Sequence, residues 1–160
     1  MNHDLKSYQG INPVCCCFSL RKATRAVTQF FDRYLEPADI RATQFTLLLT
    51  LSSAAGKTLT EMAEGLVMDR TTLTRNLKPL EKSGFITTVK LADRRTKGYV
   101  LTEKGLHAIE RGVPLWTKAQ EQITTQLGHD RYMRFLDELK LVRSFANSPK
   151  SPREKNSHHD

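Results

Sequence analysis

Residues 58–84 read TLTEMAEGLVMDRTTLTRNLKPLEKSG, and this segment predicts two short helices joined by a few residues. The first helix is expected to begin after Thr58, whose hydroxyl can cap the free amides of a helix. Glu61 stands three residues later, where its side chain can reach back to the amide of the cap residue. The helix is expected to end near Gly65. This reciprocal capping pattern predicts the start of the helix closely.

The second helix of this segment is expected to begin after Asp69, a residue type that also caps helices. Leu73, Leu77 and Leu80 form a narrow inward stripe along it, and Gly84 is a typical stop. The remaining positions are mostly polar or basic. Two short helices joined by a few residues, the second polar on its outer face, are typical of a helix-turn-helix.

A β-hairpin is expected directly after the two helices. Residues 85–90 and 99–101 are β-branched or aromatic at most positions, and residues 92–98 lie between them. The tip of this hairpin is expected to present Arg94, Arg95 and Lys97, with Asp93 as a pairing partner for one guanidinium. A narrow cationic projection fits the minor groove of DNA, where the negative potential attracts Arg.

Longer helices are expected on both sides of this lobe. Apolar residues recur at intervals of three and four across residues 20–34, 106–127 and 132–145. Pro114 is expected to kink the helix that contains it. Residues 45–51 are apolar nearly all round, which is typical of a buried helix. The predicted fold class is therefore mainly α with a small β-hairpin wing.

The balance of charge points to a polyanionic partner. The 160 residues, enough for one compact domain, include 25 Lys and Arg against 17 Asp and Glu, a net charge of +8. This charge suits DNA, RNA or an anionic membrane. A run of about 18 apolar residues and a secretory signal are both lacking, so a cytoplasmic protein without a membrane partner is expected. Residues 1–13 and 147–160 are polar, and a disordered arm and tail are expected there.

The outer face of the second short helix carries side chains suited to DNA. A helix fits the major groove, where Arg or Asn makes bidentate contacts to guanine or adenine and hydroxyl groups reach bases and phosphates. A single Arg on its own would be a solvated surface charge, but this combination in this order predicts binding to double-stranded DNA. The candidate DNA contacts are Thr60 of the first short helix, Arg70, Thr71, Thr72, Thr74, Arg75, Asn76 and Lys78 of the second, and Asp93, Arg94, Arg95 and Lys97 of the hairpin.

These segments resemble the MarR family of transcription regulators. The resemblance rests on residues 59–63, 69–75 and 80–86, and on Asp93-Arg94-Arg95 leading through residues 99–102 to Gly105. It covers about residues 14–145. It implies a domain over residues 14–146, with dimerisation helices at about 14–36 and 103–146 and a DNA-binding lobe at about 41–102.

Membership of this family implies a homodimer in which the terminal helices of two subunits interlock. Terminal helices rich in apolar residues agree with this, because pairing with a twofold mate buries more of their surface. Such a dimer is expected to bind a pseudo-palindromic operator whose half-site centres lie about one helical turn apart. The resemblance implies repression relieved by a ligand or an oxidant, with activation as the less common outcome.

Cys15, Cys16 and Cys17 stand together, so no long loop can be closed by an intramolecular disulfide. One interpretation makes them small apolar residues of the dimer interface. Another makes them redox sensors, because Cys17 followed by Phe resembles the sensing segment of the organic-peroxide-responsive branch of the family. That branch also has tyrosines where this chain has Ala42 and Phe45. Adjacent cysteines are poorly spaced for a metal, and neither a metal nor a cofactor is expected.

The effector type common in the family is a small aromatic ligand bound between the dimer base and the DNA-binding lobe. Phe31, Phe45 and Trp116 are candidates to line such a site, and each is equally well explained as a core residue. The sequence leaves both interpretations open.

Two other classes of function fit the sequence less well than a DNA-binding regulator does. An enzyme is not expected, because the chain has no phosphate-cradling loop, nucleophile elbow, zinc-ligand helix or pair of carboxylates in an apolar setting. A winged helix can also serve as a protein-interaction module without specific DNA binding. The cationic tip and polar helix disfavour that alternative, because the cores of protein interfaces are depleted in charge.

Overall fold

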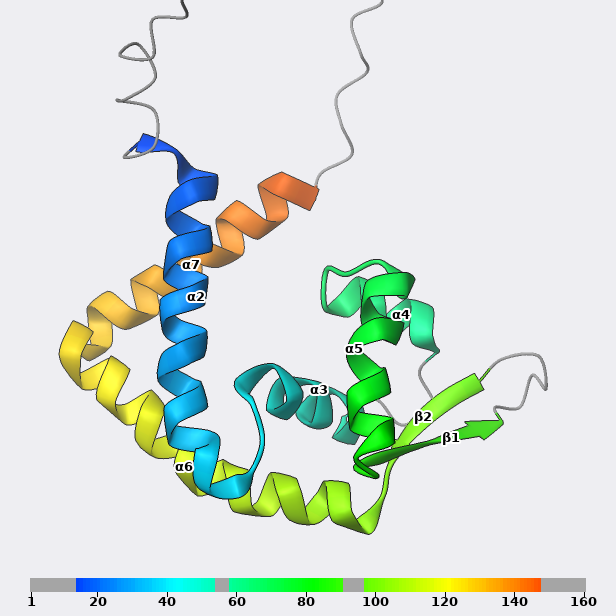
Figure 1. Cartoon of the computed structure of the whole chain (residues 1–160). Helices are drawn as coiled ribbons and strands as arrows, with labels where there is room; N and C mark the ends of the chain where they lie inside the picture. The colour runs from blue at the N-terminus through cyan, green and yellow to red at the C-terminus, as the bar shows by residue number, and fades with distance from the viewer. Residues whose placement is uncertain (1–13, 54–57, 91–96, 148–160) are drawn as a thin grey trace, which may run out of the picture. The chain divides into compact units, whose positions relative to one another are not determined.

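The computed structural model describes residues 14–53, 58–90 and 97–147 (Figure 1). The arm and tail that were expected to be disordered lie outside these ranges, except that the last helix extends through Asn147. The chain divides into two compact units, the first ending at Ala119 and the second beginning at Gln120. Among the described helices, none is both long and apolar enough to cross a membrane.

The first unit opens with helix α2 (Cys16–Leu35), a short 3-10 helix η2 (Glu36–Ala38) and helix α3 (Ala42–Ser52). The prediction of a buried helix at residues 45–51 is confirmed, because one continuous core receives side chains from several faces of α3. These buried α3 residues are Phe45, Leu47, Leu48 and Leu51.

A carboxylate of α2 fixes the start of α3. Asp32 Oδ1 accepts a hydrogen bond of 2.7 Å from the Ala42 amide, and Asp32 Oδ2 lies 3.5 Å from Arg41 Nη1. The Arg41 amide donates to Gln44 Oε1 at 2.9 Å. Because the first amides of a helix have no partner within it, these side chains satisfy donors that would otherwise depend on water.

Helices α4 (Leu59–Gly65) and α5 (Arg70–Lys82) form the predicted helix-turn-helix, with the expected boundaries. The capping box is present: the Glu61 amide donates to Thr58 Oγ1 at 3.3 Å, and the Thr58 amide donates to Glu61 Oε2 at 2.7 Å. Asp69 caps α5, and Gly84 follows its end with φ 74°. Local capping chemistry therefore sets both helix starts.

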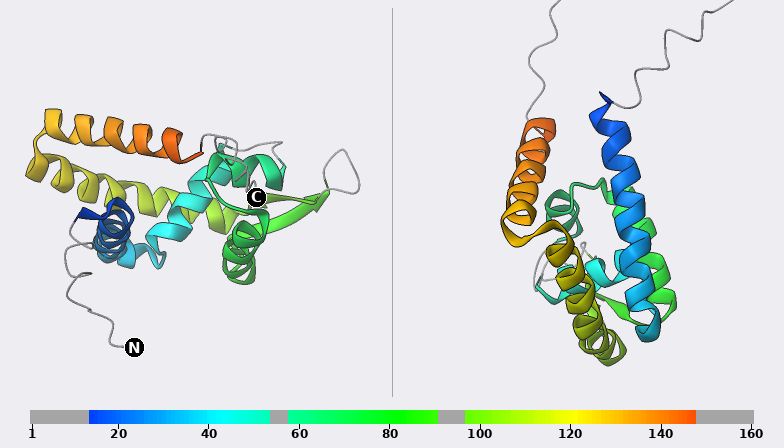
Figure 2. Two further views of the ribbon diagram at one scale, coloured as in Figure 1. Left: turned by 90° about the horizontal axis from the view of Figure 1, so that it is seen from above. Right: turned by 90° about the vertical axis from the view of Figure 1, so that its left-hand side faces the viewer.

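The predicted hairpin consists of strands β1 (Ile86–Lys90) and β2 (Lys97–Leu101), paired antiparallel from Ile86 opposite Leu101 to Lys90 opposite Lys97. It projects beyond the helices of the first unit (Figure 2). Two boundaries differ from the prediction. Phe85 is buried and precedes the strand, because its amide closes the end of α5 by bonding to the Leu80 carbonyl at 2.9 Å. Strand β2 begins two residues earlier than expected.

Helix α6 (Glu103–Leu127) continues through Pro114 without a break and contributes to both units. In the first unit Gly112 is buried against Phe45. A Cβ at Gly112 would lie 2.6 Å from the nearest ring carbon of Phe45. Gly112 therefore lets the backbone of α6 approach the aromatic core of α3.

The second unit holds the end of α6 and helix α7 (His129–Asn147), joined at Gly128 with φ 77°. The Tyr132 hydroxyl lies 2.6 Å from Gln120 Nε2, which donates to it. Taken together, the described elements confirm the predicted fold class, mainly helical with a small β-hairpin wing on a helix-turn-helix.

Candidate nucleic-acid interface

Helix α5 separates apolar and polar side chains onto opposite sides. Leu73, Leu77 and Leu80 have no exposed surface, and burying each stabilises the lobe by roughly 1.5–3 kcal/mol. Thr71, Arg75 and Lys78 are exposed. At about 100° per residue, these three fall on one stripe opposite the buried leucines. We call Thr71, Arg75 and Lys78 the outer stripe of α5.

The capping carboxylate organises the first turn of α5. Asp69 accepts hydrogen bonds from the Thr72 amide at 2.8 Å and from the Thr72 hydroxyl at 2.6 Å. These bonds, the hydroxyl bond first, lower the pKa of Asp69 below its ordinary value of 3.8. The Thr72 proton is thus committed to Asp69, leaving only the lone pairs of its hydroxyl for another partner. Arg70, the first residue of the helix, is exposed.

Two other predicted contact residues of α5 are half-buried and engaged within the lobe. The Thr74 hydroxyl donates to the Arg70 carbonyl at 2.7 Å. Asn76 Nδ2 lies 3.9 Å from Met68 Sδ, in the turn before the helix. At about 100° per residue, Thr74 borders the outer stripe, whereas Asn76 lies nearer the buried leucines. The predicted contact residues of α5 therefore differ: some point outward, whereas Thr74 and Asn76 also make hydrogen bonds within the lobe.

The remaining predicted contacts lie on α4 and on the hairpin. Thr60 is exposed in the first turn of α4. Lys97 was expected at the tip but belongs to β2, because it pairs with Lys90 in the ladder. Asp93, Arg94 and Arg95 lie outside the described residues.

The end of α5 is joined to the start of α6 by residues that the sequence reasoning did not single out for function. Thr102 caps α6: its hydroxyl accepts from the Gly105 amide at 3.2 Å and donates to the Gly84 carbonyl at 2.7 Å. The Thr102 amide donates to the Phe85 carbonyl at 3.0 Å. A Cβ at Gly105 would overlap that same carbonyl. The Thr102 and Gly105 pattern, noted above only as a family signature, is thus the signal of this joint.

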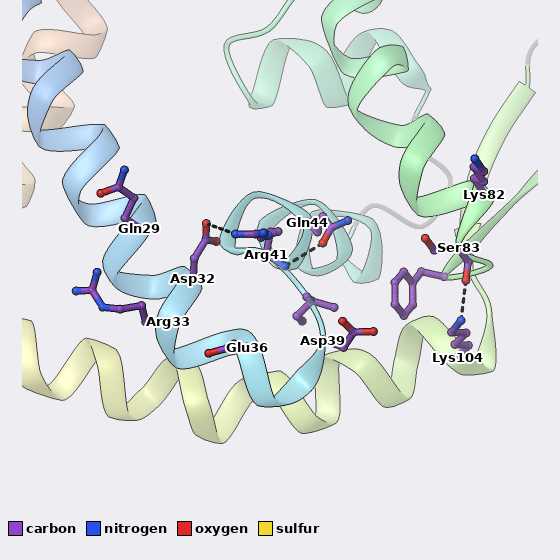
Figure 3. Close-up of a pocket in the computed structure, with 12 residues that line it drawn as sticks. Gln29, Asp32, Arg33, Glu36, Asp39, Arg41, Gln44, Lys82, Ser83 and Lys104 are labelled. Atoms are coloured by element: carbon purple, nitrogen blue, oxygen red, sulfur yellow. Dashed lines mark hydrogen bonds and ion pairs between the residues drawn. The ribbon is translucent and has the colours of Figure 1, made fainter.

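A polar cleft of about 1030 Å³ opens between the ends of α2, α3, α5 and α6 (Figure 3). Cations and carboxylates both line it. Of the lining carboxylates, Asp32 already contacts Arg41 at 3.5 Å. Phe31, Phe45 and Trp116, which were candidates either for an effector site or for the core, are not among its lining residues. The charged lining residues are Asp32, Arg33, Glu36, Asp39, Arg41, Lys82 and Lys104.

The three cysteines occupy the start of α2. Cys15 is the half-buried residue before the helix, whereas Cys16 and Cys17 are exposed in its first turn. Within the first unit alone they are therefore not core residues. No cluster of three or more His, Cys, Asp or Glu side chains suited to a metal occurs in the described ranges.

Known proteins similar to this chain include several transcription regulators. The model of the MarR family matches residues 40–97. An uncharacterised HTH-type transcriptional regulator of Bacillus cereus is 30% identical over 120 residues, covering 75% of this chain and 80% of that protein. The organic hydroperoxide resistance transcriptional regulator of Bacillus subtilis is 33% identical over 100 residues, or 62% of this chain and 68% of that one.

A solved structure of the M. tuberculosis transcriptional regulator MosR in complex with DNA is similar in both fold and sequence. Its TM-score is 0.71 and its sequence identity 34%, over 83% of this chain and 98% of that chain. The capped helix-turn-helix, the wing strands and these likenesses agree. The chain belongs to the MarR family of winged helix-turn-helix, DNA-binding transcription regulators.

Proposed function

We propose that this protein is a cytoplasmic homodimeric repressor that binds a pseudo-palindromic operator and is released by an effector. The outer stripe of α5 is the observation that carries the proposal. Thr71, Arg75 and Lys78 offer hydroxyl, guanidinium and ammonium groups on a helix whose opposite side is locked into the core. These groups suit base edges and phosphates in the major groove.

The wing would add contacts to the adjacent minor groove. Asp93, Arg94 and Arg95 are predicted at the tip from the sequence, between strands whose ladder ends at Lys90 and Lys97. A hairpin of this width can place Arg in a narrow minor groove, where the potential is most negative. The outer stripe of α5 and the wing would then grip one half-site.

Two features support a homodimer. Every residue of α2 from 21 to 27 is exposed, so this stretch buries little of its surface against the rest of its own unit. In the second unit, α7 exposes large apolar residues, including Leu141 at 64% and Phe145 at 82%. Exposed apolar helix surface is costly in water, and pairing of two chains would cover it.

Two routes of release stay open. A ligand could bind in the cleft, whose mixed charges favour a polar molecule over the small aromatic one common in the family. Oxidation could act at Cys16 and Cys17, whose exposure makes them accessible to a peroxide. The second route is supported by likeness to a regulator named for organic hydroperoxide resistance.

The test is fluorescence anisotropy of the purified protein on duplex DNA from upstream of its own gene, with a scrambled duplex as control. We expect preferential binding to the upstream duplex, weakening linearly in log Kd as log salt rises. Equal binding to both duplexes contradicts an operator there. A weak salt dependence would favour a protein-interaction module.

Adding mild organic peroxide and then thiol to the complex separates the two routes of release. Reversible loss of binding in the wild type, absent from a variant with all three cysteines changed to Ser, supports oxidation. If peroxide changes the DNA binding of neither protein, release by a ligand is the route that remains.

A further inference from the structure

Lys104, in the first turn of α6, contacts the end of α5 in two ways. Its Nζ donates a hydrogen bond of 2.8 Å to the Ser83 carbonyl, the residue that terminates α5 (Figure 3). The same ammonium lies 5.0 Å from the centroid of the Phe85 ring. Carbonyls at the end of a helix have no partner within it and carry partial negative charge, so a cation stabilises them there.

The contact belongs to a compact joint. Within three residues of Lys104, Thr102 bonds to the carbonyls of Gly84 and Phe85, at 2.7 and 3.0 Å. The three consecutive carbonyls of Ser83, Gly84 and Phe85 therefore all accept hydrogen bonds from Thr102 or Lys104. We call Ser83, Gly84, Phe85, Thr102, Lys104 and Gly105 the α5–α6 joint. The joint fixes the angle between α5 and α6.

A small change at this joint is amplified at the far end of α5. Thr71 lies twelve residues from Ser83, roughly 18 Å along the helix axis. A tilt of roughly 10° about the joint therefore displaces Thr71 by roughly 3 Å, taking the helix rise from. Hydrogen bonds to bases tolerate only a few tenths of an ångström, so such a tilt breaks them.

We propose that Lys104 is a positioning residue for DNA recognition, which holds α5 at the angle that the major groove requires without touching DNA. The inference rests on the proposed function of α5 as the helix that enters the groove. Thr102 and Gly105 fix the backbone of the joint, and Lys104 adds the side chain that ties the last turn of α5 to α6.

The test uses full-length Lys104→Met, which keeps the aliphatic stem near Phe85 but removes the donor. Lys104→Arg restores a donor. Lys118→Met is the matched control, because Lys118 is exposed on the same helix and its side chain makes no hydrogen bond or ion pair among the described residues. We expect Lys104→Met to weaken binding to the upstream duplex by roughly 3- to 10-fold, the worth of one hydrogen bond. Lys104→Arg and Lys118→Met should bind as the wild type does.

Two further readouts distinguish positioning from other roles. The slope of log Kd against log salt should stay unchanged in Lys104→Met, whereas loss of a phosphate contact would reduce it by about one. Amide hydrogen exchange without DNA should be faster at Thr102 in Lys104→Met alone, because that amide bonds to the Phe85 carbonyl inside the joint.

The outcomes separate this proposal from the proposed function. Wild-type affinity in Lys104→Met, or a slope reduced by one, overturns the positioning role while DNA binding stands. Faster exchange at Thr102 with unchanged affinity overturns it as well. Absence of specific binding by the wild type overturns the proposed function, and in that case exchange at Thr102 still reports whether Lys104 secures the joint.

Discussion

Val67 holds, after α4, the same left-handed backbone position that Gly84 holds after α5, with φ 55° and 74°. The hydrogen bonding matches as well. The Val67 amide donates to the Glu64 carbonyl at 3.0 Å, and the Gly84 amide donates to the Glu81 carbonyl at 2.9 Å. Glycine adopts this conformation freely, whereas a β-branched residue does so at a cost. The turn of the helix-turn-helix is therefore strained at Val67.

Replacing Val67 with Gly should stabilise the protein. Relief of the left-handed conformation contributes about 1–2 kcal/mol, and the greater freedom of Gly in the unfolded chain offsets about half of it. Little burial is lost, because Val67 is 52% exposed. We expect a net gain of up to about 1 kcal/mol in the free energy of unfolding, measured by urea titration at fixed protein concentration.

The reciprocal variant is the control for this prediction. Gly84→Val introduces the same strain, and nothing lies within 4 Å of the added Cβ. It should cost about 1–2 kcal/mol. If Val67→Gly destabilises the protein while Gly84→Val leaves it unchanged, the left-handed geometry at these caps is wrong.

Gly105→Ala should destabilise the protein, because the new methyl group would overlap the Phe85 carbonyl, which is main-chain and cannot rotate away. Forcing a methyl group into a packed contact costs about 1–3 kcal/mol. Thermal and urea unfolding measure the loss. Gly65→Ala is the matched helical control: it meets nothing within 4 Å and should be neutral or stabilising. Equal stability of the two variants would contradict the close approach of α6 to Phe85.

The helix boundaries near residues 58–84 could be predicted because caps are local. Thr58 with Glu61, and Asp69 with Thr72, satisfy amides only three residues away. The side on which α5 is buried followed from the spacing of its leucines. The start of β2 could not be predicted, because Lys97 is extended through its pairing with Lys90 rather than through its own propensity.

The cleft and the α5–α6 joint could not be predicted from the sequence, for a different reason. The cleft is lined by residues from the ends of several helices, so Asp32 and Lys104 line the same cleft although 72 positions separate them. The sequence pattern near either residue gives no sign that the other is close in space. Likewise, the strain at Val67 arises because the turn between α4 and α5 imposes a conformation that Val itself disfavours.

The cap of α5 should weaken in acid. Because hydrogen bonds from Thr72 lower the pKa of Asp69 below 3.8, the folded protein binds a proton at Asp69 less readily than the unfolded chain does. The charged cap therefore stabilises the fold fully above about pH 5, and this contribution is lost as pH falls through the lowered pKa.

Asp69→Asn keeps an acceptor but carries no charge. The difference in Tm between the wild type and Asp69→Asn should be constant from pH 7 to about pH 5 and shrink below about pH 4. A difference that persists unchanged to pH 3 would argue against a charged cap.

The wing should contribute to binding without supporting the fold. Arg94→Ala and Arg95→Ala are each expected to weaken binding to the upstream duplex while leaving Tm unchanged, since arginines at a hairpin tip contact the minor groove rather than the core. Anisotropy and thermal unfolding on the same samples measure the two effects. Unchanged affinity in both variants would count against a wing that contacts DNA.

Arg75 and Lys78 lie on the same outer stripe but should differ in what they recognise. Residues near the start of the recognition helix reach base edges, whereas later ones meet the backbone. Arg75→Ala should therefore cost about 1–3 kcal/mol of binding on the upstream duplex and little on a scrambled one, which lowers specificity. Lys78→Ala should weaken binding to both duplexes alike and reduce the slope of log Kd against log salt by about one. Both side chains are exposed, so neither variant should unfold the lobe, and Tm checks this. Equal losses on both duplexes for Arg75→Ala would assign Arg75 to a phosphate, and the base contacts would then have to come from Thr71 and Arg70, nearer the start of α5.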